Sequence, residues 1–404
     1  MENQPWSGDA NVHVSIVNWV ATQDEALVPR VRRLWTRIHE PRKGAGGRGD
    51  GSRKAYELAA REVCAINSSL SDQRDVSQAS VLAVNTVPQR CFTGQMIGHA
   101  RFLLSDEERA SVVSKDPSTV NVLFRYLNGE EFLTGGKLDR SVLDFGQRTQ
   151  LEAASYAAAF KWVRTNVLPD RETNALKGAD SVGNARPHHK QFLSHWWQLA
   201  FPRPELISNI EQLGRYVVCS RVTKRPIFVF VDPAIRPGDA LSCFCFEDDY
   251  SYGVLQSATH WQWFLAKSSK LTERLRYSPE SVFDTFPWPQ SPTKKQIDAV
   301  ASAAVAVRQV RAAALQQIEG GLRALYRTLE LPGKNPLKDA HAALDTAVLA
   351  AYGFEEKKDL LAQLLALNLA VSQREKSGEP VTAPGVPASY GDAAGLITED
   401  CIRP

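Results

Sequence analysis

The sequence predicts an α+β protein whose C-terminal region is entirely helical. Up to residue 290, short segments rich in Val, Phe and Ile alternate with Gly and Pro turn signals, which indicates a mixed sheet. Beyond Pro292 the chain becomes rich in alanine, and its apolar residues recur at helical spacing. The chain has 404 residues and is 43% hydrophobic, so it can form two or three domains with buried cores.

The N-terminal part begins with an apolar strand. Residues 11–19 alternate between polar and apolar side chains and then run apolar, which predicts one strand that must pair with a sheet. Residues 42–53 are basic and rich in glycine, which predicts a flexible surface loop, with contact to phosphates as the alternative. The changes in pattern along the chain predict four segments: residues 1–78, 79–290, 291–376 and a flexible tail over 377–404.

The spacing of apolar residues predicts the main strands and helices. Strands are expected at 215–222, 226–231 and 241–246. Helices are expected at 147–164, 205–213, 253–267, 294–330, 337–351 and 356–374. The pair Gly320-Gly321 can kink or split the helix that starts at residue 294.

The helix predicted at 253–267 has two unlike faces. One face is apolar, and the opposite face carries Gln256, Thr259, His260, Trp263 and Lys267. A tryptophan among polar donors on an exposed face is unusual in a monomer. The face is therefore either a second packing contact inside the domain or a surface that binds a partner.

The stretch DTFPWP, residues 284–289, lies where the α+β part ends and the helical part begins. Its two prolines forbid continuation of a helix or a central strand. A plain stop does not require two large aromatic residues. We therefore expect Phe286 and Trp288 to seal the contact between the two parts.

The positive charge of the chain is unevenly distributed. The formal net charge is only +3, yet residues 30–61 hold ten Lys/Arg against three Asp/Glu, and residues 186–225 hold seven against two. Blocks of one sign are usually solvated surface, but together with aromatic residues they also fit a nucleic-acid footprint.

Several other classes of protein are not supported by the sequence. It has no apolar run of transmembrane length, no signal peptide, no phosphate-binding loop of the Walker type, no dinucleotide-binding GxGxxG and no GxSxG elbow. Its six cysteines are scattered without a CxxC, which favours a reducing, cytoplasmic location without a membrane partner. His188, His189 and His195 lack a carboxylate or cysteine at metal-ligand spacing, so no metal is expected.

Several segments in a fixed order resemble one family, and the match extends over nearly the whole chain. The segment QPWSGDANVHVSIVNW (4–19) resembles the strand that closes a methyltransferase sheet. The other matching segments are FTGQMIGHARFLLS (92–105), VLFRYLNGEEF (122–132), HWWQLAFPRPEL (195–206), RYVVCSRVTKRPIFVFV (215–231), YGVLQSATHWQWF (252–264), RYSPESVFDTFPWP (276–289) and LYRTLELPGKNPLKDAHAALDTAVLAAYGF (325–354). Together they resemble the C-terminal half of MmeI-like type IIG restriction–modification enzymes and their phage-defence relatives, which are SAM-dependent DNA adenine-N6 methyltransferases.

The resemblance implies a function for each segment. Residues 1–78 would be the end of a methyltransferase sheet and a connecting loop, residues 79–290 a DNA target recognition domain, and residues 291–376 a helical domain. The family's Asn-Pro-Pro-Tyr/Phe motif, which holds the flipped adenine, does not occur, because the only Asn-Pro is Asn335-Pro336 and Leu337 follows it.

The glycine-rich loop that would hold S-adenosylmethionine is also not found. The chain alone is therefore expected to bind duplex DNA without a cofactor and to be inactive as an enzyme. It would be a natural or artificial fragment, or one subunit of a split enzyme. S-adenosylmethionine would belong to the complete enzyme, together with a catalytic domain or subunit.

The resemblance places DNA contacts in the recognition domain. For phosphates the sequence offers Lys190, Arg203, Arg215, Arg221, Lys224 and Arg225. For base edges it offers Gln256, Thr259, His260, Lys267 and, on the flank, Gln262, with Ser220 and Thr223 as short hydroxyl donors. Trp196, Trp197 and Trp263 are possible stacking residues, although a Trp-Trp pair more often anchors a strand to a core.

Three functions remain open from the sequence. The first is a specificity module that binds DNA with strong salt dependence. The second is a subunit or fragment that completes an active methyltransferase with a partner. The third is a protein-interaction scaffold without salt-sensitive DNA affinity. The recognised DNA sequence and the oligomeric state do not follow from the residues.

Overall fold

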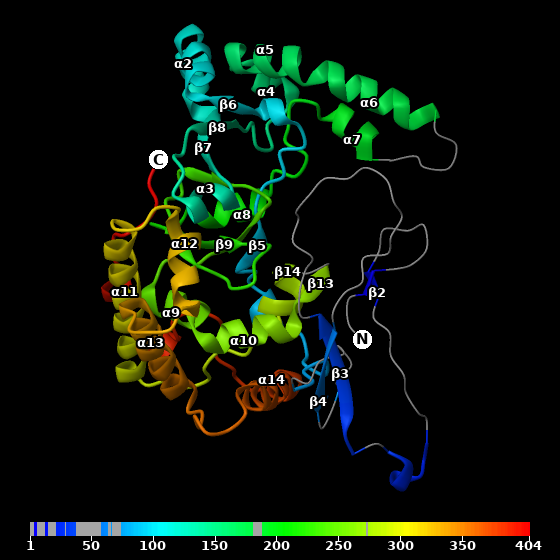
Figure 1. The fold of residues 1–404 in the computed structure, drawn as a ribbon. Helices are drawn as coiled ribbons and strands as arrows, with labels where there is room; N and C mark the ends of the chain where they lie inside the picture. Colours follow the sequence, from blue (N-terminus) through cyan, green and yellow to red (C-terminus); the bar gives the residue numbers. More distant parts are fainter. Residues whose placement is uncertain are drawn as a thin grey trace.

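The computed structural model describes residues 4–5, 13–14, 22–28, 30–37, 58–63, 66, 74–180, 188–271 and 274–404. It confirms an α+β fold with a helical C-terminal region (Figure 1). The predicted loop 42–53 lies outside the described residues, as does most of the predicted strand 11–19. Of that strand the structure describes β2 (His13–Val14), which pairs with β1 (Gln4–Pro5).

The central sheet forms the middle of the molecule. Its order is β10-β9-β12-β5, with all strands antiparallel. The strands are β5 (Cys91–Thr93), β9 (Tyr216–Ser220), β10 (Val229–Val231) and β12 (Leu241–Phe244). Every residue of β9, β10 and β12 is buried, so these strands are covered on both faces and read as continuous apolar runs.

The upper sheet has the order β11-β7-β8-β6, and β11 runs parallel to β7. The strands are β6 (Leu103–Ser105), β7 (Leu123–Leu127), β8 (Arg140–Leu143) and β11 (Ile235–Pro237). A short turn joins β11 to β12 and so links the two sheets. A Cβ on Gly238 in this turn would lie 2.3 Å from the hydroxyl of Tyr126, so the turn requires glycine.

Helices around the upper sheet form a separate lobe with its own core (Figure 1). They are α2 (Asp106–Lys115), α4 (Gln150–Ala154), α5 (Ala157–Asn166), α6 (Leu168–Asp180) and α7 (His188–Ser194). The single helix predicted at 147–164 is therefore two helices. Three further helices lie elsewhere in residues 79–290, the segment expected to be a recognition domain, which we call the recognition part. They are α1 (Ala83–Thr86), α3 (Gly129–Thr134) and α8 (Pro204–Ile210).

The helix predicted at 253–267 is also two helices, α9 (Asp249–Gln256) and α10 (Ala258–Lys267). The break falls at Ser257, whose hydroxyl accepts a hydrogen bond from the amide of His260 at 3.4 Å and caps α10. All eight residues of α9 are buried. A Cβ on Gly253 would lie 2.7 Å from Val300, so glycine lets α9 approach the helical region closely.

The helical region consists of α11 (Lys294–Leu315), α12 (Gly321–Arg327), α13 (Pro336–Tyr352) and α14 (Leu360–Lys376). Thr293 begins α11 with a capping box that includes Gln296. The predicted split at Gly320-Gly321 is confirmed, and both glycines have positive φ, +90° and +67°. Among the described residues, no helix is both long and apolar enough to cross a membrane.

The aromatic residues of the DTFPWP stretch seal the contact between the recognition part and the helical region. Phe286 and Trp288 are buried, at 0% and 1% exposure. The ring of Phe286 packs against His260 of α10 at 4.9 Å and against Tyr352 of α13 at 6.4 Å between centroids. The hydroxyl of Tyr352 donates to the carbonyl of Pro287 at 2.8 Å. The prediction from the sequence is therefore confirmed for this stretch.

The C-terminal tail differs from the loose segment that its Pro and Gly content predicts. Ile402 forms a parallel bridge with Val231 at the outer edge of the central sheet. The amide of Ile402 donates to the carbonyl of Phe230, and the amide of Asp232 donates to the carbonyl of Ile402, each at 2.9 Å. The tail is therefore held by main-chain bonds that its composition does not reveal.

A buried network of two arginines and two aspartates joins the tail to the rest of the fold. Arg215 contacts Asp249 at 2.7 Å and Asp400 at 3.1 Å. Arg308 of α11 contacts Asp249 at 2.6 Å and Asp400 at 2.7 Å. Both guanidinium groups lie over the ring of Phe230, at 3.6 and 5.1 Å from its centroid. The four charges connect the sheet, α9, α11 and the tail; we call them the ion network.

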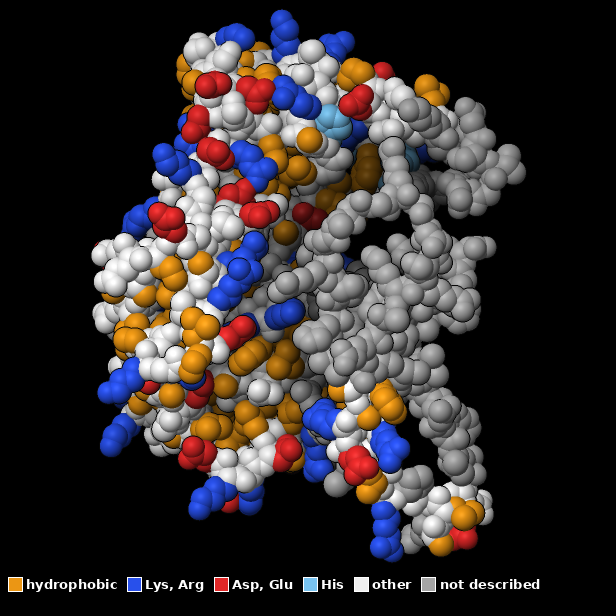
Figure 2. Space-filling view, in the orientation of Figure 1, with side chains coloured by type: hydrophobic (Ala, Val, Ile, Leu, Met, Phe, Trp, Pro, Cys, Tyr) orange, Lys and Arg blue, Asp and Glu red, His pale blue; other side chains and the backbone are white. Residues whose placement is uncertain are grey.

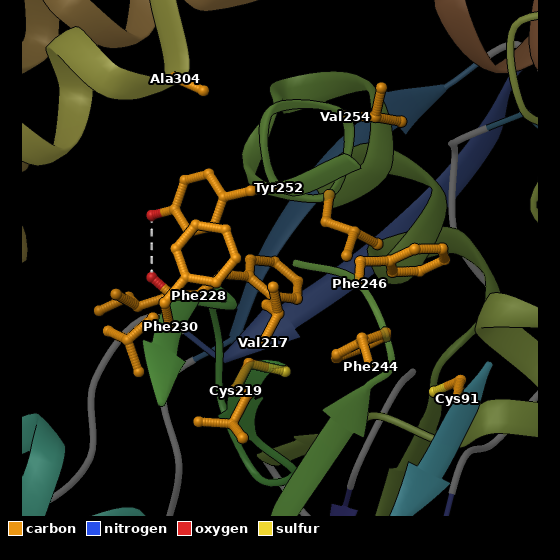
Figure 3. Close-up of a cluster of buried hydrophobic side chains, with 14 of the residues drawn as sticks. Cys91, Val217, Cys219, Phe228, Phe230, Phe244, Phe246, Tyr252, Val254 and Ala304 are labelled. Atoms are coloured by element: carbon orange, nitrogen blue, oxygen red, sulfur yellow. Dashed lines mark hydrogen bonds between the residues drawn. The ribbon is translucent and has the colours of Figure 1, made fainter. Parts of the chain in front are cut away.

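Aromatic residues of the central sheet pack beside this network. Figure 3 shows Phe228, Phe230 and Tyr252 side by side beneath α11, which carries Ala304. The hydroxyl of Tyr252 donates to the carbonyl of Phe228 at 2.9 Å. The core of the recognition part and the core of the helical region are thus one continuous cluster.

We expect Asp400→Asn to lower the free energy of unfolding by about 2 kcal/mol at pH 7. Removal of one partner from a buried ion pair costs about 3–5 kcal/mol, and Asp400 is half-exposed, so the effect is smaller. Burial works against ionisation of Asp400, but the hydrogen bond and charge of Arg308 outweigh it and lower its pKa.

Because the pKa of Asp400 is lower in the folded state, its contribution is complete above about pH 4 and is lost below it. The difference between wild type and Asp400→Asn in urea unfolding should therefore be the same at pH 7 and pH 5. Asp392→Asn is the matched control, because Asp392 is an exposed tail carboxylate that caps the amide of Ala394. Equal stability of the two variants would contradict the role of the ion network.

Candidate nucleic-acid interface

Three arginines gather on one surface of the recognition part. Arg203 precedes α8, Arg221 follows β9, and Arg276 ends β14 (Arg274–Arg276). Arg203 and Arg276 are exposed, and Arg221 is half-buried. Segments that are far apart in the sequence therefore bring three cations together; we call them the arginine cluster.

Main-chain bonds fix the position of the cluster. The amide of Tyr277 donates to the carbonyl of Arg221 at 2.7 Å, and Val222 bridges Arg276 in antiparallel register. The amide of Arg221 donates to the carbonyl of Ala240 at 2.8 Å. The hairpin of β13 (Ser269–Leu271) and β14 is thus attached to the end of the central sheet, so the cluster is built on a rigid frame.

The backbone of Arg203 is strained. Its φ is +52°, and it is the only non-glycine residue with positive φ in the part of the chain that the structure describes. Such a conformation costs about 1–3 kcal/mol and occurs mainly where function constrains the backbone. Pro204 follows and starts α8, so the direction of the Arg203 side chain is set by the backbone.

The positive charges of the three arginines in the cluster repel one another. The pKa of Arg221 is lowered, first by burial and next by the positive charge of Arg276, with Arg203 adding to the effect. Asp239 and Glu280 lie near enough to oppose this repulsion. Three cations against two carboxylates leave an excess of positive charge, which a polyanion would neutralise.

Exposed apolar side chains border the cluster. Phe201 is 45% exposed, and the guanidinium carbon of Arg203 lies 5.4 Å from its ring centroid. Met96, which bridges Phe201, is 37% exposed, and Val222 is 47% exposed. Guanidinium groups beside apolar groups match the edges of guanine and the methyl group of thymine.

Positive charge does not dominate the surface as a whole. Figure 2 shows Lys and Arg side chains interspersed with Asp and Glu over the visible face. This agrees with a net charge of only +3. The arginine cluster is thus a local excess of positive charge on a molecule whose overall charge is nearly balanced.

Other residues predicted to bind DNA have different surroundings. Lys190 on α7 and Lys224 are exposed. The hydroxyls of Ser220 and Thr223 donate to the carbonyls of Val222 and Arg225, at 3.2 and 2.6 Å. Both hydroxyls therefore stabilise the turn after β9, and the two lysines remain free to face a partner.

Two of the predicted phosphate contacts are structural. Arg215 is 2% exposed and belongs to the ion network. Arg225 packs over the rings of Trp261 and Tyr326, at 4.5 and 5.5 Å, and faces the helical region. Sequence alone does not separate a surface arginine from one that is buried against a carboxylate or an aromatic ring.

Of the two alternatives for the polar face of residues 253–267, the structure supports the packing contact inside the domain and not the exposed partner surface. Gln256, Thr259 and His260 are 4%, 1% and 0% exposed. The Oε1 atom of Gln256 accepts from the amide of Phe228 at 3.0 Å, and His260 lies 2.9 Å from the hydroxyl of Tyr277. The polar groups are satisfied inside the core, and burial lowers the pKa of His260 to about 4.

The remaining residues of that face are also not free. Trp263 is fully buried, and its indole nitrogen donates to the hydroxyl of Thr285 at 3.1 Å. Lys267 is half-buried, its pKa is lowered by burial, and its Nζ lies 3.5 Å from the carbonyl of Val76. Gln262 is half-buried on α10. Helix α10 therefore lies inside the fold, and the face that was predicted to be polar packs against other helices.

The tryptophan pair is a packing element. Trp196 and Trp197 are 8% and 7% exposed in the core of the upper lobe. The indole nitrogen of Trp197 donates to the carbonyl of Arg148 at 2.9 Å. The alternative given above for the pair, an anchor for the core, is therefore the one that the structure supports.

Sequence reasoning missed Arg276 as a member of the cluster. It lies in RLRYSPE, residues 274–280, and nothing in its local pattern separates it from a solvated cation. The available signal was the likeness of residues 276–289 to the end of a recognition domain. Among the described residues there is no group of three or more side chains that could hold a metal ion.

Comparisons with known proteins show which family this chain resembles. The family model for the MmeI target recognition domain matches residues 218–290. DNA methyltransferase A of Bacillus subtilis (strain 168) is 30% identical over 321 residues, which cover 77% of this chain and 33% of the relative. The solved structure of the type IIL restriction–modification enzyme MmeI in complex with DNA matches 80% of this chain and 40% of its own, with a TM-score of 0.58 and 22% identity.

The family match defines the class: residues 218–290 are a target recognition domain. More specifically, the chain carries a target recognition domain of the MmeI type and is homologous to DNA methyltransferase A. It spans 33% of the length of that curated relative. Arg221 and Arg276 lie within the matched residues 218–290, and Arg203 lies just before them.

We expect Gln256→Ala to destabilise the protein by about 1–3 kcal/mol without changing the DNA affinity of the folded chain. The substitution leaves the buried amide of Phe228 without an acceptor. Urea unfolding gives the stability and fluorescence anisotropy gives the affinity. Gln262→Ala, on the half-exposed side of α10, is the control and should change neither quantity. A selective loss of DNA affinity in Gln256→Ala would restore its predicted role in base reading.

Proposed function

We propose that the chain recognises a specific sequence in duplex DNA for an adenine-N6 methyltransferase of a restriction–modification or phage-defence system. The observation that carries the proposal is the arginine cluster, because three cations converge within and beside a DNA target recognition domain. The DNA-bound state of the MmeI structure supports the same class of partner.

Each part of the surface has its own role in this proposal. The guanidinium groups of Arg203 and Arg276 read guanine edges or hold phosphates, and both can form paired hydrogen bonds. Phe201 and Val222 contact thymine methyl groups. Lys190 and Lys224 hold phosphates on either side, where they contribute affinity without sequence information.

The methylation step requires groups that we assign to a catalytic domain or subunit. DNA methyltransferase A and MmeI are longer than this chain, and the sequence lacks the Asn-Pro-Pro motif. We propose that S-adenosylmethionine binds to that catalytic part and that this chain alone is inactive. A partner that carries the motif would restore methylation when it is added in trans.

Fluorescence anisotropy with a random-sequence 30-base-pair duplex at several salt concentrations tests the cluster. We expect Arg203→Ala and Arg276→Ala each to weaken binding, and each phosphate contact that is lost should reduce the salt slope by about one. Arg323→Ala is the control, because Arg323 is an exposed cation on α12 of the helical region. It removes the same charge at a distance from the cluster.

Two results would contradict the proposal. One is binding that does not change with salt in the wild type. The other is an equal loss of affinity in Arg323→Ala, which would mean that only net charge matters. Circular dichroism of each variant ensures that the compared chains are folded.

A further inference from the structure

A cavity of about 590 Å³ lies where the recognition part, the helical region and the tail meet. Its walls come from α3, from the end of α11 and the start of α12, and from residues 400–402. Sites for small molecules commonly have volumes of about 300–1,000 Å³ and occur at domain junctions. None of the three arginines of the cluster lines this cavity, so it is a separate feature.

The walls of the cavity are mainly apolar. The apolar side chains include Phe132 and Leu138 on the recognition side and Leu315, Ile318 and Leu322 on the helical side. These groups would accept an aliphatic or aromatic body of a ligand, because burial of apolar surface is favourable. A ligand there would contact the recognition part, the helical region and the tail together.

The charged groups of the cavity are balanced except at one residue. Glu131 pairs with Arg140, and Arg308 is held by Asp249 and Asp400. Arg311 is 5% exposed, and its hydrogen bonds go to neutral oxygens of Phe228, Tyr252 and Gln256. Within the part of the chain that the structure describes, Arg311 is therefore a buried cation that forms no ion pair with a carboxylate.

Two observations show that positive charge is in excess at Arg308 and Arg311. The Nε atom of Arg311 and the Nη1 atom of Arg308 have no hydrogen-bond partner among the described residues. Burial lowers the pKa of Arg311, but Tyr252, Tyr326 and Asp400 outweigh it and raise the pKa, so Arg311 stays charged. Asp400 also binds Arg215 and Arg308, so three buried arginines share the two carboxylates of the ion network. A buried cation is costly unless it is paired, so one further negative charge in the cavity would be stabilising.

We propose that the cavity binds a small amphipathic anion. Its carboxylate or phosphate group lies toward Arg311, and its apolar body lies between α3 and α12. Binding stabilises the junction that the tail closes, because Asp400 and Ile402 are part of the wall. The site does not depend on DNA, so it can be tested without the proposed function.

Thermal unfolding and isothermal calorimetry of the full chain without DNA test the proposal, with octanoate, octyl phosphate and 1-octanol as probes. We expect at least one of the two anions to bind with one ligand per chain and to raise the unfolding midpoint. The uncharged 1-octanol should do neither. The stronger of the two anions identifies whether a carboxylate or a phosphate is preferred.

Variants separate the cavity from other surfaces. Ile318→Trp fills the cavity and should abolish binding, and Arg311→Met should weaken it about tenfold or more. Arg323→Met removes an exposed cation on α12 and should bind like the wild type. If Arg311→Met does not fold, Ile318→Trp decides alone. Equal binding of 1-octanol, or retained binding in Ile318→Trp, would show adsorption to apolar surface and overturn the proposal.

Discussion

The architecture depends on an ion network of four charges, of which Arg215, Arg308 and Asp249 are buried and Asp400 is half-exposed. Arg215 and Arg308 share Asp249 and Asp400, and both guanidinium groups rest on the ring of Phe230. Burial of an arginine is costly, and a carboxylate partner reduces that cost. The ion network therefore fixes the relative positions of the sheet, α9, α11 and the tail. If the tail moved away, Asp400 would leave with it, and two cations would share one carboxylate.

This constraint reaches the proposed DNA-binding surface through the central sheet. Arg215 precedes β9, and Arg221 follows the same strand. The sheet is covered by α9, which glycine at 253 allows to pack closely on α11. Arg221 of the arginine cluster thus follows a strand whose other end is held by the ion network. Such a frame can hold guanidinium groups in the fixed positions that base reading requires, and flexible loops alone would do this less well.

The sequence predicted the helical region, the split at Gly320-Gly321 and the aromatic contact at Phe286 well, because local spacing and turn chemistry determine them.

Prediction from the sequence failed for residues whose surroundings are determined by tertiary contacts. Gln256 and His260 look like an exposed polar face, yet their partners are the amide of Phe228 and the hydroxyl of Tyr277, which are distant in sequence. Arg215 and Arg203 look alike in sequence, and only the fold separates a buried ion pair from an exposed cation on a strained backbone. The Pro and Gly content of the tail predicted a loose segment. The tail is instead held by main-chain bonds to Phe230 and Asp232, which are distant in sequence, so no local pattern reveals them.

The most direct test of the account is selection from a random duplex library with the wild-type chain, followed by the same selection with Arg276→Ala. The account predicts that the wild type enriches one short motif and that the variant loses preference at one or two positions of that motif, most simply a guanine. Enrichment of the same motif with unchanged preference at every position would contradict the assignment of Arg276 to base reading. If no motif is enriched by the wild type, the arginine cluster does not act as a sequence reader in this chain.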